Sequence, residues 1–482
     1  MAKDITSWTE KVKTVIGFPP FEWWSYPPPI LLDVFIYNIT NKERFLSGED
    51  PKMIVEEVGP ILYKEIWTHT DVVFNDNSTM TYLVNRTLEY MEENTIDLNA
   101  TLIVPNLATL AVASRLWDAS IFTKMTVNAL FRIMKKEHLI HTTVYNFLYN
   151  NTDSFLDALH KTLPNLVPVR NVGIVPLMYK DYFDNVTAFI GTAHGNELFS
   201  LIDRYRNSDN IPGHPDRCKT KITNATEGII YNQMIRKDSV LKYYRKCICK
   251  TTSLYYEGEH TLYGLKTYKF EMAPSDLNRT YPPEEDCFDT KPSLPNGTAD
   301  VSKCTFCKHY RIESETIRLT RLNNTFSAYP VTTSFVYFNH TDDSLNTCAE
   351  IKIPNGKMAP PSEAYLEPIT GIPLKSSAAL QANLNVKPLQ GFDKSFKRFS
   401  GQQIPLCYLH YHSDGLPLKV FCLIYLMKAL PAIGWMLTVL SLSFGLYCIW
   451  ESVRRKQRTQ NSESIKDANV ELETFLKQPV IN

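Results

Sequence analysis

The longest apolar run in the chain extends from Ala429 to Trp450 and contains 22 residues without a charge. At about 1.5 Å per residue such a helix is roughly 33 Å long, which is enough to cross the hydrocarbon core of a bilayer. Basic residues follow directly, at Arg454, Arg455, Lys456 and Arg458, as is typical of the cytoplasmic side of a span. A buried core helix is the alternative, but core helices seldom lack charges for so long. We therefore predict a transmembrane helix at 429–450, with a cytoplasmic tail at 451–482.

Apolar and polar positions alternate in several parts of the preceding chain. The apolar run from Leu32 to Tyr37 predicts a short buried strand. Residues 268–272 and 382–387 alternate between apolar and polar side chains, which predicts half-buried antiparallel strands. Neither a linker nor a repeat divides residues 23–428, so one ectodomain is the simplest interpretation.

Between about residues 105 and 164 the hydrophobic period becomes helical. The clearest apolar stripe consists of Phe122, Met125, Ala129 and Ile133, with Leu130 at its edge. The opposite side of this predicted helix carries Lys124, Phe131, Arg132 and Lys135, with Lys136 on the flank. This basic side is explained by an ordinary solvated face, or by a surface that docks a polyanion or an anionic lipid.

Composition argues against several functions. The 51 basic and 51 acidic side chains leave no net charge that would indicate a nucleic-acid partner. The sequence contains no G-x-S-x-G elbow, P-loop, dinucleotide fingerprint or H-E-x-x-H motif. Its 11 histidines are scattered singly, and we interpret each as a surface or core residue. We therefore expect a protein that is not an enzyme and that has neither a cofactor nor a metal site.

Glycosylation sequons indicate the compartment. Eleven of the 29 asparagines before residue 429 begin an Asn-X-Ser/Thr sequon, where chance would give roughly four. The tail contains none. They are Asn38, Asn77, Asn85, Asn99, Asn150, Asn185, Asn224, Asn278, Asn296, Asn323 and Asn339. This excess predicts a glycosylated surface in the lumen or outside the cell.

The cysteines are consistent with that compartment. Six of the ten lie between Cys218 and Cys307, which indicates local disulfides in an oxidising environment. Zinc is the alternative, because Cys247, Cys249, Cys304, Cys307 and His309 could supply soft ligands. Cys448, at the cytoplasmic end of the span, is either a palmitoylation candidate or an ordinary helix residue.

The N-terminus conflicts with an ectodomain. Residues 1–18 contain no apolar stretch able to act as a signal peptide or anchor. Either an upstream segment is missing from this sequence, or the interpretation as an ectodomain is wrong; we favour the missing segment.

Five segments together resemble one family, the class B scavenger receptors. They are PPPILLDVFIYNITN (27–41), VEEVGPILYKE (55–65), PNLATLAVAS (105–114), DVSKC (300–304) and LEPITGIPLKSSAALQANLNVKP (366–388). The resemblance covers roughly residues 23–450. It implies a mixed α+β membrane-anchored ectodomain with an antiparallel β-barrel-like core, a helical cap and an apolar tunnel. It also implies two membrane spans, of which this sequence contains only the C-terminal one.

The resemblance has implications for individual residues. The predicted helix at 122–136 falls in the cap, where family members present basic residues, so Arg132, Lys135 and Lys136 are candidate ligand-docking residues. Disulfides Cys218–Cys287 and Cys247–Cys304 are implied, whereas a third family bridge has Asp289 at one of its positions. The extra Cys249 and Cys307 lie two or three residues beyond the second pair, and we predict that they bond to each other. A Cys348–Cys407 bridge remains open.

The resemblance implies binding and transfer of lipids, lipoproteins or other anionic apolar particles at the plasma membrane. Burial of apolar surface alone can drive such capture without a reactive side chain. The alternative is a trafficking receptor of the endosome or lysosome membrane whose cap binds a protein. The tail lacks an acidic di-leucine signal, because Leu472 and Leu476 are separated by three residues, and this favours the plasma membrane.

Overall fold

The computed structural model describes residues 21–162, 170–179, 183–190, 194–195, 197–212, 214–246, 248, 250–302 and 330–476. Contacts divide the chain into two compact units, Met1–Gly415 and Leu416–Asn482. The N-terminal segment before residue 21, and with it the question of an upstream signal, lies outside the described residues.

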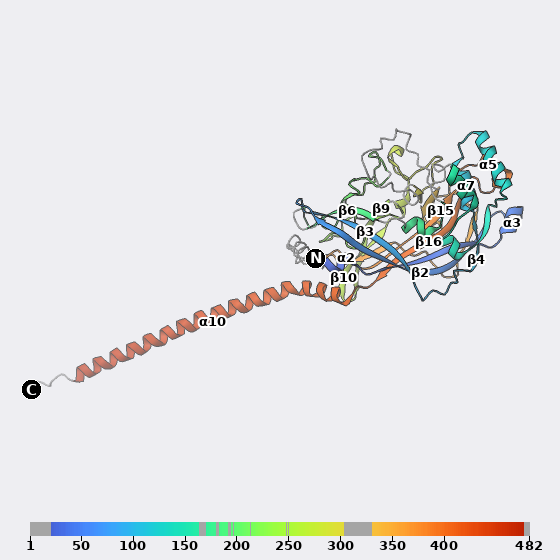
Figure 1. Cartoon of the computed structure of the whole chain (residues 1–482). Helices are drawn as coiled ribbons and strands as arrows, with labels where there is room; N and C mark the ends of the chain where they lie inside the picture. The colour runs from blue at the N-terminus through green and yellow to red at the C-terminus, as the bar shows by residue number, and fades with distance from the viewer. Residues whose placement is uncertain are drawn as a thin grey trace, which may run out of the picture. The chain divides into compact units, whose positions relative to one another are not determined.

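The first unit is built on one large sheet with the strand order β7-β6-β3-β2-β1-β16-β15-β14-β10-β9-β8 (Figure 1). Its N-terminal half consists of β1 (Ile30–Ile39), β2 (Met53–Phe74), β3 (Thr79–Tyr90), β6 (Phe183–Phe189) and β7 (Ile202–Tyr205). Its C-terminal half consists of β8 (Leu241–Arg245), β9 (Lys250–Leu262), β10 (Leu265–Met272), β14 (Glu363–Leu366), β15 (Pro373–Asn385) and β16 (Gln403–Asp414). The two halves meet where β1 pairs with β16, and every pair along this order is antiparallel.

Shorter strands complete the sheet. β11 (Thr298–Asp300) pairs with β12 (Val331–Ser334), which pairs with β15, while β13 (Ala349–Lys352) runs parallel to β2. A separate ladder joins β4 (Thr101–Pro105) to β5 (Leu139–Thr143). The 3₁₀ turns are η2 (Pro274–Leu277), η3 (Pro283–Glu285), η4 (Val336–Phe338) and η5 (Lys394–Phe396). The mixed α+β class predicted from the sequence is confirmed.

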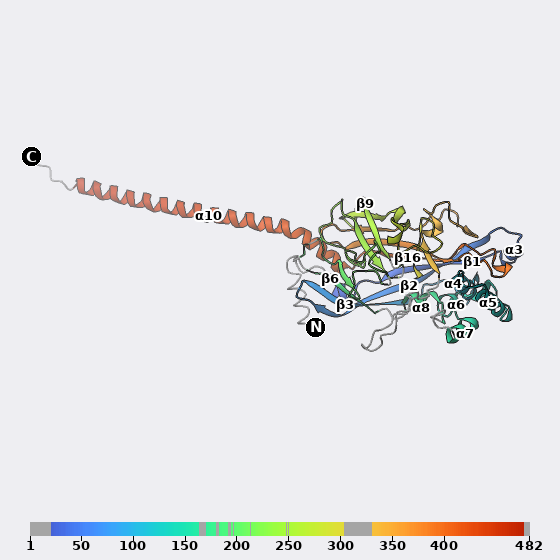
Figure 2. The same ribbon diagram turned by 90° about the horizontal axis from the view of Figure 1, so that it is seen from above.

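Helices gather at one end of this unit (Figures 1 and 2). They are α4 (Leu107–Arg115), α5 (Ile121–Ile133), α6 (Val144–Leu148) and α7 (Ser154–Thr162), and we call this group the cap. Polar N-cap side chains begin three of them, because each accepts a hydrogen bond from a backbone N–H of the first turn. These caps are Asn106, Ser120 and Thr143. The other short helices are α2 (Phe21–Ser25), α3 (Lys42–Ser47) and α8 (Ile174–Tyr179).

The predicted strands are present, with one correction to their burial. Leu32–Tyr37 lies within β1, and residues 268–272 lie within β10. Residues 382–385 belong to β15, but this part is buried on both faces, since Asn383 and Leu384, which point to opposite faces, are both 0% exposed. β12 pairs with this end of β15, and the Asn383 side chain donates to Ser334 Oγ across the pair at 3.0 Å. Burial of these amides is tolerated because they are hydrogen-bonded.

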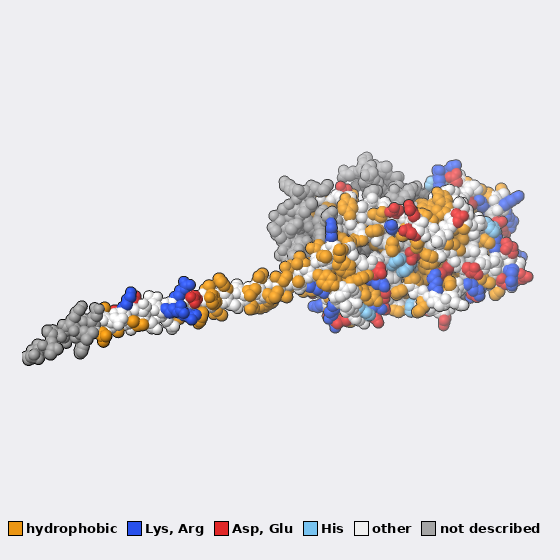
Figure 3. Space-filling view, turned by 90° about the horizontal axis from the view of Figure 1, so that it is seen from below, with side chains coloured by type: hydrophobic (Ala, Val, Ile, Leu, Met, Phe, Trp, Pro, Cys, Tyr) orange, Lys and Arg blue, Asp and Glu red, His pale blue; other side chains and the backbone are white. Residues whose placement is uncertain are grey.

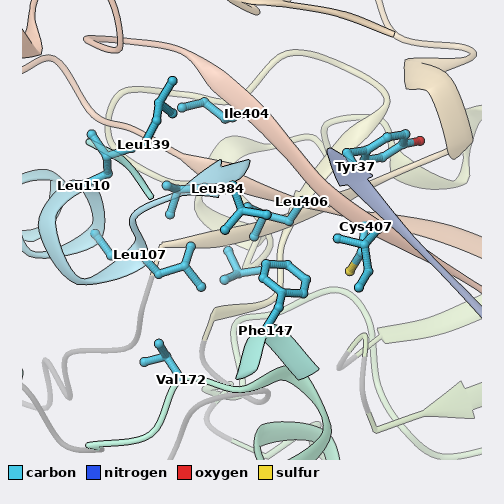
Figure 4. Close-up of a cluster of buried hydrophobic side chains, with 14 of the residues drawn as sticks. Tyr37, Leu107, Leu110, Leu139, Phe147, Val172, Leu384, Ile404, Leu406 and Cys407 are labelled. Atoms are coloured by element: carbon cyan, nitrogen blue, oxygen red, sulfur yellow. The ribbon is translucent and has the colours of Figure 1, made fainter. Parts of the chain in front are cut away.

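One apolar core extends from the sheet into the cap. Figure 4 shows Phe147 of α6 beside Leu384 and Leu406, with Leu107 of α4 on the same side of the strands. Phe147 and Leu384 are both 0% exposed. The cap is therefore fixed to the sheet by hydrophobic packing.

The second unit is one long helix, α10 (Leu418–Leu476), with Pro431 inside it. Its residues 418–470 are long and apolar enough to cross a membrane by length and composition. Figure 3 shows apolar side chains along this helix, followed by a cluster of basic ones. The predicted span at 429–450 thus lies within a longer helix that fits a membrane anchor, and Cys448 is exposed on it.

Candidate functional site

An apolar cavity lies inside the first unit, between the sheet and helices α4 and α8. Its volume, taken as the space open to the centre of a water molecule, is about 150 Å³. One water needs about 10–15 Å³ by this measure, so the cavity has room for at least ten water-sized groups. It is lined by residues of β1, β8, β9, β12, β14, β15 and β16, of the two helices and of several loops.

The cavity follows strand β15 from Ser376 to Leu384. Eight steps along an antiparallel strand span about 27 Å. Half of a bilayer core, which holds one layer of acyl chains, is about 15 Å thick, so an extended acyl chain fits this length. Most of the described lining residues are aliphatic or aromatic. One end is formed by Leu107, Leu384 and Leu406, and these belong to the core shown in Figure 4.

The other end of the cavity carries a buried ion pair. Arg245 of β8 donates to Glu65 Oε2 of β2 at 2.5 Å, and Glu65 is only 2% exposed. The guanidinium of Arg245 lies 3.9 Å from the centre of the Tyr411 ring. The Tyr411 hydroxyl is 3.1 Å from that of Tyr179. Tyr411 pairs with Ala378, which is two residues from Ser376, and Glu65 pairs with Ile30, which also lines the cavity. The ion pair and the two tyrosines therefore lie toward the Ser376 end of the cavity.

A second buried charge, Glu227, also lines the cavity. Its carboxylate accepts from the Tyr82 hydroxyl at 2.8 Å and from Arg86 at 3.2 Å. Burial raises the pKa of Glu227, and Arg86 opposes that change. The imidazole of His69 lies 3.7 Å away and stacks on the ring of Trp24. His69 Nδ1 is 2.7 Å from the Trp24 carbonyl oxygen, so this network fixes helix α2 to the sheet.

His69 predicts a loss of stability in acid. Complete burial lowers its pKa from 6.5 to about 3, so the unfolded state binds more protons between these values. Stability from this group is full above pH 6.5 and falls as the pH drops below it. At pH 5 the loss is about 2 kcal/mol, from 1.36 kcal/mol per pH unit. Urea unfolding of H69Q at pH 7 and pH 5 should show a pH dependence smaller by that amount.

The control for this measurement is H141Q, which changes an exposed histidine and should keep the pH dependence of the original chain. Comparison of variants is needed because the raised pKa of Glu227 acts with the opposite sign. An unchanged pH dependence in H69Q would contradict a neutral, buried His69.

Helix α5 is rotated relative to the prediction. Phe122, Met125 and Ile133 of the apolar stripe are 78%, 60% and 76% exposed. Lys124 is buried instead, and its Nζ donates to the carbonyl oxygens of Trp117 at 2.6 Å and Gln390 at 2.9 Å. The side of the helix predicted to be solvated therefore packs against the protein.

The physical reason is that this side carries two of the helix's buried apolar side chains. Val127 and Phe131 are 7% and 4% exposed. The Phe131 ring lies 4.9 Å from that of Phe155 and 5.7 Å from that of Phe396. Backbone oxygens accept the ammonium protons of Lys124, so its burial does not leave these donors without hydrogen-bond partners.

The three candidate docking residues lie in different environments. Arg132 is exposed and forms a bidentate pair with Asp393. Lys135 is exposed. Lys136 is largely buried and bonds to Asp153 Oδ2 at 2.8 Å. The positive charge of this group is therefore partly neutralised, and its docking role stays a prediction.

One predicted disulfide is present, between Cys218 and Cys287, with a Cα–Cα distance of 5.6 Å. Cys247, Cys249, Cys304 and Cys307 lie outside the described residues. Cys348 and Cys407 are free and buried, so the bridge left open between them is absent. Cys407 lies on β16, whereas Cys348 precedes β13 on the far side of β1 and β2. Burial raises the pKa of both thiols to about 12.

The sequons lie at the surface. Of the ten that the structure describes, none has a buried asparagine, and six asparagines are exposed. The exposed ones are Asn77, Asn99, Asn150, Asn224, Asn278 and Asn339. Asn323 lies outside the described residues. Modification of these sites stays a prediction that their exposure permits.

Sequence reasoning missed the ionised groups of the cavity. Glu65 lies on β2 and Arg245 on β8, seven places apart in the strand order, and nothing local in the chain links them. A signal was available in Glu65, a charge that lies between the apolar Tyr63 and Trp67 on the buried face of β2.

Known proteins are similar to this chain over most of its length. The CD36 family model matches residues 3–454. Scavenger receptor class B member 1 of Cricetulus griseus is 24% identical over 471 residues, which cover 92% of this chain and 85% of that protein. Lysosome membrane protein 2 of Homo sapiens is 24% identical over 455 residues, which cover 90% and 86%. The chain therefore belongs to the CD36 family, the class B scavenger receptor family that its motifs resemble.

Proposed function

We propose that this receptor captures an apolar lipid and passes it through the cavity toward the membrane. The observation that carries the proposal is the apolar cavity along β15, with ionised groups toward one end. Burial of each methylene group contributes about 0.8 kcal/mol, so a long acyl chain is held without a reactive side chain. A polar headgroup would lie at the Arg245 end.

The route from the cavity to the membrane follows the chain itself. Strand β16 lines the cavity with Leu409 and Tyr411 and ends at Asp414. Only three residues separate Asp414 from the start of α10 at Leu418. The Arg245 end of the cavity is thus the end from which the chain continues toward the membrane anchor. We propose that ligand moves in this direction.

A second function is favoured by the exposed stripe of α5, in which a soluble partner or a particle docks on the cap. Phe122, Met125 and Ile133 form an apolar surface beside the charges of Arg132 and Lys135. Exposed aromatic and aliphatic side chains of this kind commonly mark interaction sites. This surface supports the alternative of a trafficking receptor at the endosome or lysosome membrane that binds a protein, and it equally supports lipoprotein docking at the plasma membrane.

The test separates transfer from docking. Ala378 lines the cavity from the centre of the sheet, so A378W places an indole in it. In cells given lipoprotein with a labelled lipid, we expect lipid uptake to fall at least tenfold while particle binding stays unchanged. A158W, on an exposed position of α7, is the matched control. Unchanged uptake in A378W at equal surface level would contradict transfer through the cavity.

The second arm changes the cap. F122D with M125D should reduce particle binding at least tenfold and leave binding of the free labelled lipid in detergent unchanged. Loss of a co-purified soluble protein instead of the particle would favour the trafficking receptor. If the double variant binds both the particle and the soluble protein as well as the original chain does, a docking role for the stripe is contradicted.

A further inference from the structure

Two histidines and one aspartate meet on the outer side of the central strand pair. His410 and His412 lie two residues apart on β16, and their rings stack with centroids 4.8 Å apart. Asp33 of β1 pairs with His410 across the ladder. Neighbours two apart on a strand share a face. Leu409 and Tyr411, which line the cavity, lie on the opposite face of β16.

The donor atoms of these three side chains converge. Asp33 Oδ2 lies 3.2 Å from His412 Nε2 and 3.5 Å from His410 Nδ1. One ligand atom from each residue lies within 4.8 Å of the others. Zinc bonds of about 2.0–2.2 Å place neighbouring donors of a tetrahedron about 3.3–3.6 Å apart. Of the two distances to the carboxylate, 3.5 Å lies within this range and 3.2 Å lies just below it.

Ser377 of β15 determines which nitrogen of His410 carries the proton. The Ser377 hydroxyl donates to the Pro361 carbonyl oxygen at 2.6 Å. Its Oγ is 3.1 Å from His410 Nε2 and, having used its proton, accepts from Nε2–H. In neutral His410 the lone pair of Nδ1 then points at the Asp33 carboxylate. A cation between these two electron-rich atoms, either a metal ion or a proton, removes their repulsion.

A second hydrogen bond of this kind is typical of metal-binding histidines, because it fixes the ring orientation and increases the basicity of the ligand nitrogen. The three side chains are 20–29% exposed, which leaves access for an ion and for a water ligand. Two imidazoles and one carboxylate suit zinc and other divalent transition metals, whereas calcium and magnesium prefer oxygen ligands.

We propose that Asp33, His410 and His412 form a site for a divalent transition metal of the zinc class. The ion joins β1 to β16, the two strands at which the N-terminal and C-terminal halves of the sheet meet. It therefore stabilises the folded unit by an amount that increases with the free metal concentration relative to the Kd. None of the three proposed ligands lines the cavity, although Ser377 does, so the presence of the site does not depend on the proposed lipid transfer.

The test uses the full chain purified in detergent micelles, stripped by a chelator and titrated with Zn²⁺ alone. We expect one saturable site at these residues, with a rise in melting temperature on binding. D33N and H412Q should weaken that site at least 100-fold. S377A keeps all three ligands and should weaken it about 10–100-fold, through loss of the hydrogen bond to His410. H141Q should bind as the original chain does.

Cobalt gives an independent readout, because visible absorption of bound Co²⁺ reports its coordination by nitrogen ligands and should disappear in H412Q. Ca²⁺ and Mg²⁺ should not displace it. If D33N or H412Q fails to fold, the test uses zinc binding by S377A and the cobalt spectrum of the original chain. Absence of saturable zinc binding, or zinc binding unaffected by D33N, H412Q and S377A, would overturn the proposal. A proton would then be the cation that Asp33 shares with the two histidines.

Discussion

Replacement of Glu65 by alanine should lower the free energy of unfolding by about 3–5 kcal/mol, because it leaves the Arg245 guanidinium buried without its carboxylate. Glu65 is 2% exposed, and the Arg245 side chain is 11% exposed. The unpaired guanidinium would therefore stay largely removed from bulk water, which is costly. Urea unfolding of the full chain in micelles, followed by tryptophan fluorescence, measures this change.

Two further variants make this result specific. D157A removes an exposed carboxylate that pairs with Lys161 and should cost less than about 1 kcal/mol. E65L combined with R245M replaces the buried pair by apolar side chains and should recover most of the loss. A loss below 1 kcal/mol in E65A would contradict a desolvated ion pair. If lipid uptake also falls in the stable double variant, the pair contributes to ligand binding as well.

Removal of the Cys218–Cys287 disulfide should lower the free energy of unfolding by about 4 kcal/mol. The bridge joins residues 69 positions apart, and the chain-entropy model gives this magnitude for a loop of that length. Both cysteines are buried, and C218S is the variant to measure in the same urea assay.

C422S is the control, because Cys422 is a free, exposed cysteine on α10. It should unfold at the same urea concentration as the original chain. In cells, C218S should also reach the surface in smaller amount, since loss of a native disulfide commonly impairs folding at 37 °C. A change of less than 1 kcal/mol in C218S would show that the loop is held by packing alone.

Local pattern was sufficient to predict the strands but not the orientation of α5. The periodicity located that helix and the residues on each side of it. Which side is buried depends on segment 390–396, whose carbonyl oxygens and phenylalanine rings receive Lys124 and Phe131. These groups are more than 250 residues away along the chain. A lysine that is hydrogen-bonded by distant backbone atoms looks the same in the sequence as a solvated one.

The same limit applies to sites formed by pairing of distant strands. His410 and His412 were interpreted as isolated residues, because Asp33 comes near them only through the register of β1 and β16. The cavity was expected from family resemblance, yet its lining could not be named, because strand order decides which faces enclose it. Family motifs gave the architecture; contacts between far segments decide the chemistry.

The pairing of β1 with β16 also affects how the protein is made. Leu32 forms its final pair with Tyr411, a residue synthesised about 380 positions later. At 5–20 residues per second a ribosome needs roughly 20–75 s to cover that distance. During this time β1 has an unpaired edge, which is a template for incorrect pairing. The nascent chain is therefore open to incorrect pairing at β1 until its last strand emerges.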